Sequence, residues 1–207
     1  MSRIAGRLRP MRNKALRKKL NNTSFSLIAS NCNGAFILHD LGVRFNSPFV
    51  NLWVKPKDFL KMLEDLKGYM DAPLSFVKED GIDYPVGVIR DVRIYFMHYD
   101  SEQEALRKWN ERKARIDYDN LFILFNDRDG CTYEDLQTFD NLPYKNKIAF
   151  TNKPYPELKS AFYIKGFEGQ PSVGDCFEYM PHSFGKKYYD QFDYVSWFNS
   201  SGKRSSL

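Results

Sequence analysis

The stretch DNLFILFNDRDG, residues 119–130, contains the clearest strand of the chain and the polar turn that follows it. Five consecutive apolar residues, 121–125, are typical of a central strand that is buried on both faces of a sheet. The run ends abruptly at Asn126, and Asp127, Arg128 and Asp129 follow. Because open α/β sheets bind ligands at the carboxyl ends of their strands, this turn is the first candidate for a site.

Strand-like and helix-like patterns alternate on both sides of this run. Strands are predicted at residues 24–30, 48–54, 74–78, 86–99, 147–151 and 161–164. Helices are predicted at residues 35–41, 58–70, 101–115 and 132–139, with a terminal aromatic helix at 186–198. This alternation favours a layered α/β/α fold with a mostly parallel or mixed sheet.

The size and composition of the chain fit one soluble domain. A chain of 207 residues can bury one sizeable core, so we divide it into an arm at 1–22, an α/β domain at 23–199 and a disordered tail at 200–207. Three cysteines without CxxC spacing suggest neither a disulfide framework nor a zinc site. We find no apolar run long enough to cross a membrane and no signal peptide, which predicts a cytoplasmic protein.

The arm carries most of the basic character of the chain. Its first twenty residues contain eight cations and no acid, which exceeds the net charge of +5, so the rest of the chain is mildly acidic. This asymmetry, with no recognisable nucleic-acid-binding motif, argues against a nucleic acid partner. Apolar residues recur at helical spacing, although Pro10 is expected to interrupt the helix. Such an arm can lie on an anionic bilayer, which would make the protein peripheral, or remain a solvated tail.

Residues 127–129 offer two carboxylates one position apart. Asp127 and Asp129 could hold Mg²⁺ or Mn²⁺, which would neutralise a diphosphate leaving group, and Arg128 could contact phosphate. The pattern is similar to the acidic metal-binding motif of nucleotide-sugar glycosyltransferases. The alternative is structural, because Asp and Gly are common in turns.

A second candidate site lies where the first predicted strand meets a helix. Ser30, Asn31 and Gly34 stand at a helix N-terminus, where free amides and the helix dipole favour a phosphate. The same field is expected to lower the pKa of Cys32, with His98 or His39 as a base for acyl transfer. The alternative is an inert, packed thiol.

Further candidates lie on the predicted helix at 101–115 and near the C-terminus. His98, just before that helix, is a candidate general base for a sugar hydroxyl, and Lys108 and Arg112 are candidate diphosphate contacts. A strand-end histidine and a solvated helix face are the alternatives. The aromatic segment at 188–194 could stack on a sugar ring or simply pack.

Several stretches together resemble the bacterial family known as domain of unknown function 1919, often labelled exopolysaccharide or capsular polysaccharide biosynthesis protein. They are SNCNGAF at 30–36, NSPFVNLWV at 46–54, YPVG at 84–87, HYDSEQEALRKWNERKARI at 98–116, DNLFILFNDRDGCTYEDL at 119–136, LPYKNKIAFT at 142–151 and YYDQFDYVSW at 188–197. The resemblance covers residues 25–199. It implies an α/β fold and a genomic setting among genes for surface-polysaccharide assembly, and it assigns no mechanism.

The leading hypothesis is a metal-assisted sugar transferase that takes a nucleotide-sugar donor and a lipid-linked glycan acceptor at the inner membrane face. Asp127 and Asp129 would hold the metal, Lys108 and Arg112 would contact phosphate, and His98 would be the base. One alternative is an acyl or phosphoryl transferase built around Cys32. Another is a non-catalytic assembly protein that binds a glycan. The sequence predicts no oligomeric state.

Overall fold

The computed structural model describes residues 2–201, with side chains from residue 6 onward, so most of the predicted tail at 200–207 lies outside the described residues. The helices are α1 (Ser2–Lys19), α2 (Asn33–Leu41), α3 (Pro56–Glu64), α4 (Leu66–Asp71), α5 (Glu102–Lys113), α6 (Tyr133–Asn141) and α7 (Tyr194–Asn199). The strands are β1 (Ser26–Ala29), β2 (Ser75–Val77), β3 (Val86–Ile89), β4 (Val92–Tyr95), β5 (Leu121–Asn126), β6 (Lys147–Thr151) and β7 (Ala161–Tyr163). Short 3₁₀ turns are present at Tyr118–Asn120 and Tyr188–Gln191.

The main sheet is parallel throughout, in the order β1-β5-β6-β7. β5 lies inside this sheet, with Phe122 opposite Leu27 on β1 and Phe125 opposite Ala149 on β6. The predicted α/β class and the mostly parallel sheet are therefore confirmed. A second, antiparallel sheet of β2, β3 and β4 lies in the connection between β1 and β5.

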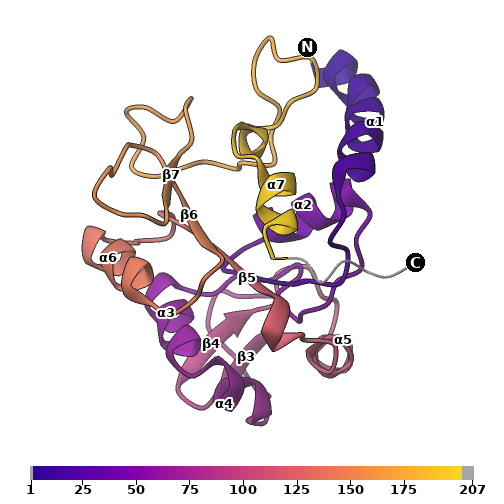
Figure 1. Cartoon of the computed structure of the whole chain (residues 1–207). Helices are drawn as coiled ribbons and strands as arrows, with labels where there is room; N and C mark the ends of the chain where they lie inside the picture. Colours follow the sequence, from indigo (N-terminus) through magenta and orange to yellow (C-terminus); the bar gives the residue numbers. More distant parts are fainter. Residues whose placement is uncertain (1, 202–207) are drawn as a thin grey trace.

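Helices cover both faces of the main sheet, because the side chains of β5 alternate between two hydrophobic clusters. Ile123 and Phe125 face the cluster formed with α3, α5, α6 and the small sheet. Phe122 and Leu124 face the cluster formed with α2, α7 and the C-terminal segment. Figure 1 shows α3 and α6 on one side of the sheet and α2 and α7 on the other. This arrangement is the predicted layered architecture.

Four predicted elements differ from the structure. Residues 48–54 form no strand, and only Trp53 makes an isolated bridge, to Tyr95. Residues 86–99 fold back as a β3–β4 hairpin, with Arg90 at a positive φ in the turn. Residues 58–70 form two helices that meet at Asp65, whose non-helical backbone ends α3 and whose carboxylate caps α4. At the C-terminus a 3₁₀ turn precedes α7, because Asp193 starts a new helix by accepting from Ser196 N.

The N-terminal arm is a helix that packs on the body. α1 continues through Pro10, so the expected interruption is wrong. Arg9 is only 4% exposed and forms ion pairs with Asp40 on α2 and Asp190 near the C-terminus. Leu20 completes the cluster on the α2 side of the sheet. No helix within residues 2–201 is long and apolar enough to cross a membrane.

Candidate ligand-binding cleft

A cleft of about 450 Å³ opens beside the carboxyl ends of β1 and β5. Its lining residues come from the β1–α2 turn and the start of α2, the irregular segment at Trp53, the segment after β4, the β5–α6 loop and the C-terminal segment. They are Asn31, Cys32, Asn33, Phe36, Trp53, Met97, His98, Arg128, Asp129, Asp175 and Phe177. The fold therefore brings five residues of the predicted sites to one place, from three separate stretches of sequence.

The first turn of α2 forms one wall of this cleft. Cys32 precedes the helix and supplies no side-chain cap, whereas the Oδ1 atom of Asn31 accepts a hydrogen bond from Asn33 N at 3.1 Å. Gly34 allows the helix to start directly on β1, because a Cβ atom there would stand 2.5 Å from the Cβ of Ala29. The positive end of α2 therefore faces the cleft at close range.

Asn33 is the residue that sequence reasoning missed. Its side chain is 1% exposed, lines the cleft, and has no hydrogen-bond partner at either Oδ1 or Nδ2. The buried hydroxyl of Ser30, three residues earlier, also lacks a partner. An unpartnered buried polar group costs about 1–3 kcal/mol, so native proteins seldom retain one without a use. The amide of Asn33 is suited to a polar ligand in the cleft.

The thiol of Cys32 is not activated. Burial, together with the nearby carboxylate of Asp175, raises its pKa, so the expected lowering is wrong. The Sγ atom lies 4.0 Å from the carbonyl oxygen of Leu52, as a weak donor. His98 is exposed and lines the same cleft, whereas His39 lies in the last turn of α2, at the other end of that helix.

The predicted metal pair does not form. The two carboxylate oxygens of Asp127 accept from Val173 N and Asn152 N, each at 2.7 Å, and the side chain is buried. Asp127 therefore joins two loops, and it is absent from the cleft lining, where Asp129 is exposed. Burial raises the pKa of Asp127. Across the described side chains, no three Asp, Glu, His or Cys residues are grouped to hold a metal ion.

Aromatic rings and one ion pair form the remaining walls. Phe36 stacks on Phe177 with ring centroids 4.2 Å apart, and Trp53 lies against Tyr95 at the same spacing. Arg128 forms an ion pair with Asp175. The cleft thus combines flat apolar surfaces with a cation and the start of a helix.

Other predicted residues lie elsewhere. Arg112 donates to the hydroxyl of Tyr99 at 2.7 Å and stands over the ring of Phe45, and neither Arg112 nor Lys108 lines the cleft. Their predicted phosphate contacts are therefore not brought to this site. In the aromatic segment, Tyr189 is fully buried and donates to Asp40. It therefore packs inside the protein, which was the alternative to stacking on a sugar ring.

The fold and the cleft define a class of protein, an α/β protein with a ligand-sized cleft at the carboxyl end of a parallel sheet. The family described as "Domain of unknown function (DUF1919)" matches residues 4–199, so the chain belongs to that family. The matched range includes residues 4–19 of α1, which the stretches quoted above did not reach. An uncharacterized protein of Haemophilus influenzae strain Rd is 57% identical over 187 residues, which cover 90% of each chain.

Proposed function

We propose that this protein is a cytoplasmic sugar transferase of bacterial surface-polysaccharide assembly, and that its cleft binds the phosphate-bearing sugar donor. The observation that carries the proposal is the buried side chain of Asn33, which has no partner at the start of α2. The polysaccharide setting rests on the label that the family often carries. A nucleotide sugar is the donor class that uses both a phosphate site and flat apolar walls.

Three kinds of hydrogen-bond donor around the cleft favour an anionic ligand. The first turn of α2 offers backbone N–H groups and the positive end of the helix dipole. The Nδ2 atom of Asn33, which lines the cleft, is an available donor, because it has no partner in the protein. Arg128 also lines the cleft, as a cation in an ion pair with Asp175.

The rest of the cleft suits a sugar and its acceptor. Ligand pockets typically occupy roughly 300–1,000 Å³, and a volume of about 450 Å³ falls within that range. Phe36, Trp53 and Phe177 present rings of the kind on which sugars and bases stack. His98 is the candidate base, since an imidazole can accept the proton of an acceptor hydroxyl near neutral pH. The acceptor would be a lipid-linked glycan.

A divalent cation, Mg²⁺ or Mn²⁺, belongs to this proposal only as a companion of the donor phosphates. The carboxylates that line the cleft are Asp129 and Asp175, and Asp175 is already paired with Arg128. Transfer through a Cys32 acyl enzyme is less favoured, because a thiol with a raised pKa is mostly protonated at neutral pH. The donor phosphate would be held chiefly by the first turn of α2 and the side chain of Asn33, with Arg128 shared between the phosphate and Asp175.

The test is donor binding by Asn33→Leu. Leucine has a similar size and no polar atoms, so it should stabilise the free protein, because two unpartnered polar atoms disappear. It should also remove the thermal stabilisation that nucleotide sugars or pyrophosphate give the wild type, which is about 2.7 kcal/mol at 100 times the dissociation constant. Thermal unfolding of both proteins, without ligand and with the nucleotide sugar or pyrophosphate, each with and without Mn²⁺, measures both effects.

Asn110→Leu is the matched control, since Asn110 is exposed on α5 and does not line the cleft. It should keep the ligand-dependent shift. If Asn33→Leu still bound the nucleotide sugar, the phosphate would not bind at the start of α2. If no nucleotide sugar or pyrophosphate shifts the wild type, the donor hypothesis fails, and acyl donors tested on Cys32→Ala become the next comparison.

A further inference from the structure

The inner face of α1 packs against the rest of the protein. Arg9 reaches Asp40, Asp190 and the carbonyl oxygen of Gly185, and Asn13 donates to Asp40 at 2.8 Å. Leu16 and Leu20 pack against the cluster on the α2 side of the sheet. These two leucines are thus covered by the protein, whereas Met11 stays exposed.

The opposite face of α1 forms a separate basic stripe. Arg7, Met11, Lys14 and Lys18 follow one another at spacings of four, three and four residues, which places them in one row along the helix. All four are exposed, and Met11 is 71% exposed. Within the described side chains none of the three cations has an ion-pair or hydrogen-bond partner, and α1 contains no acid. We call these four residues the outer face.

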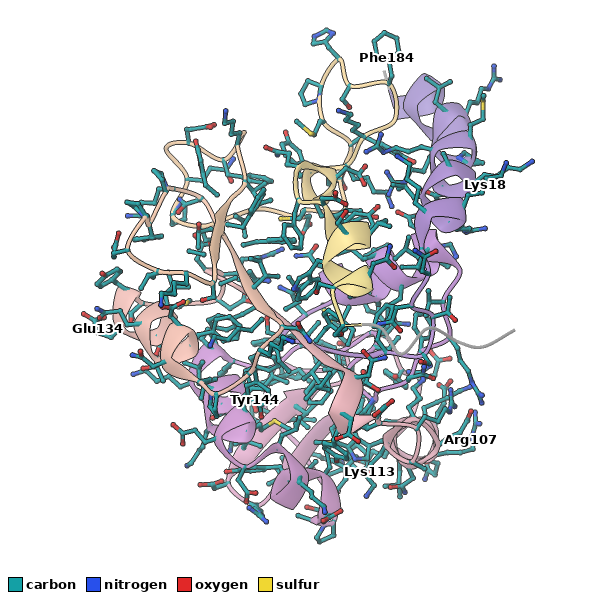
Figure 2. The ribbon with its side chains drawn as sticks, in the orientation of Figure 1. Lys18, Arg107, Lys113, Glu134, Tyr144 and Phe184 are labelled. Carbon is teal, nitrogen blue, oxygen red and sulfur yellow. The ribbon has the colours of Figure 1, made fainter. Side chains whose placement is uncertain are left out.

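An exposed aromatic side chain lies beside the helix. Phe184 is 85% exposed, the highest value among the large hydrophobic residues of the described region. The hydrogen bond from Arg9 Nη1 to Gly185 O, at 3.3 Å, ties its loop to α1. Figure 2 shows Phe184 projecting near the N-terminal end of α1, at the same end of the molecule. Phe184 and Met11 are apolar groups that water does not favour.

We propose that the outer face of α1 binds an anionic lipid bilayer, with Phe184 and Met11 entering the headgroup region. Charge complementarity selects this partner: three free cations stand in a row without acids, and the rest of the chain is mildly acidic. Each cation near an anionic membrane surface contributes about fivefold in affinity. Attachment is electrostatic and reversible, because Leu16 and Leu20 pack against the protein. The proposal stands independently of the sugar-transferase function.

The experiment is cosedimentation of the full chain with vesicles. Vesicles of phosphatidylcholine alone are compared with vesicles that also contain phosphatidylglycerol, at low and high salt. The wild type should bind only the anionic vesicles and should dissociate in high salt. The triple variant Arg7→Gln, Lys14→Gln, Lys18→Gln should bind about a hundredfold more weakly, from about fivefold for each cation.

The matched control removes the same charge from the other end of the molecule. Lys57, Lys67 and Lys78 are exposed lysines on α3, α4 and after β2, and their triple Gln variant should bind as the wild type does. Phe184→Ala should weaken binding to the anionic vesicles at low salt, where the wild type is bound. Thermal unfolding confirms that each variant is folded.

Three outcomes would overturn the proposal. The first is no sedimentation with anionic vesicles, and the second is an equal loss of binding in the control triple variant, which would mean a response to net charge alone. The third is tighter binding of the outer face to a single-stranded oligonucleotide than to the vesicles, which would make nucleic acid its partner.

Discussion

At the scale of the residue, one buried carboxylate holds two loops beside the cleft. Asp127 ends the central strand and accepts one hydrogen bond from Asn152 N, after β6, and one from Val173 N, in the C-terminal segment. Its position at the end of β5 is the position expected of a ligand contact, and its actual partners are backbone amides. The β5–α6 loop, which lines the cleft, is thus joined to the loop after β6 and to the C-terminal segment through a side chain that does not enter the cleft.

We predict that Asp127→Asn destabilises the protein. Asparagine keeps one acceptor oxygen and turns an NH₂ group toward the second amide, which leaves a buried donor without a partner. The expected loss is about 1–3 kcal/mol in the free energy of unfolding, measured by urea denaturation. Asp129→Asn is the control, because Asp129 is exposed. Equal stability of the two variants would contradict the structural role of Asp127.

At the scale of the element, α1 is fastened to α2 by Asp40. The Oδ2 atom of this carboxylate accepts from Arg9, Lys187 and Tyr189, and its Oδ1 atom accepts from Asn13. Burial acts to raise the pKa of Asp40, but hydrogen bonds from Arg9 and Tyr189 outweigh it and hold the pKa at about 2. The ion pairs therefore persist across the usual working range of pH.

We predict that this carboxylate makes stability depend on acid pH. Its pKa is lower in the folded state than in the unfolded chain, where Asp titrates near roughly 3.9. The unfolded state therefore binds more protons in this window, so the stabilisation is present above about pH 4 and is lost as the pH falls toward 2. Asp40→Asn should cost about 3–5 kcal/mol at neutral pH and should flatten this part of the pH profile.

Urea denaturation at a series of pH values measures both effects of Asp40→Asn. Asp91→Asn is the matched control, because Asp91 also has a lowered pKa from its partner Lys61, but the pair is exposed and screened by water. It should change stability little. An Asp40→Asn profile parallel to that of the wild type would show that Asp40 does not govern acid stability.

The elements that were predictable are those whose local pattern has a single interpretation. Residues 121–125 are apolar without interruption, and only a central strand of a parallel sheet buries such a run on both faces. Residues 48–54 have a similar composition, but Pro48 and the positive φ of Asn51 give an irregular segment. The turn at Arg90 was missed because no glycine or asparagine marks its positive φ.

The candidate site was predictable only where it follows strand ends. Cys32 and Arg128 were expected there, since the carboxyl ends of neighbouring parallel strands meet at one edge. Asp175 and Phe177 reach the cleft from the irregular C-terminal segment, which has no periodic pattern to place it. The importance of Asn33 could not be read from sequence, because its missing partners are a property of packing.

At the scale of the whole molecule, one sheet separates two hydrophobic clusters. Neighbouring residues of β1 and β5 contribute alternately to the two clusters. Separation of these strands would therefore expose apolar side chains of both clusters to water. α1 and the C-terminal segment close the second cluster, and they are tied to each other through Arg9 and Asp190. Both ends of the described chain therefore depend on the same core.

From this shared sheet we predict that the protein unfolds as a single cooperative unit. Trp109 belongs to the cluster on the α3 side, and Trp197 packs against the cluster on the α7 side. Two variants isolate them: Trp53→Phe with Trp197→Phe leaves Trp109, and Trp53→Phe with Trp109→Phe leaves Trp197. In each variant the urea midpoint from tryptophan fluorescence should equal the midpoint from far-ultraviolet circular dichroism, because an all-or-none transition gives every probe the same midpoint. A fluorescence transition of Trp197 at lower urea than the circular dichroism transition would mean that α1, α7 and the C-terminal segment detach first, and that the shared strands do not couple the two faces.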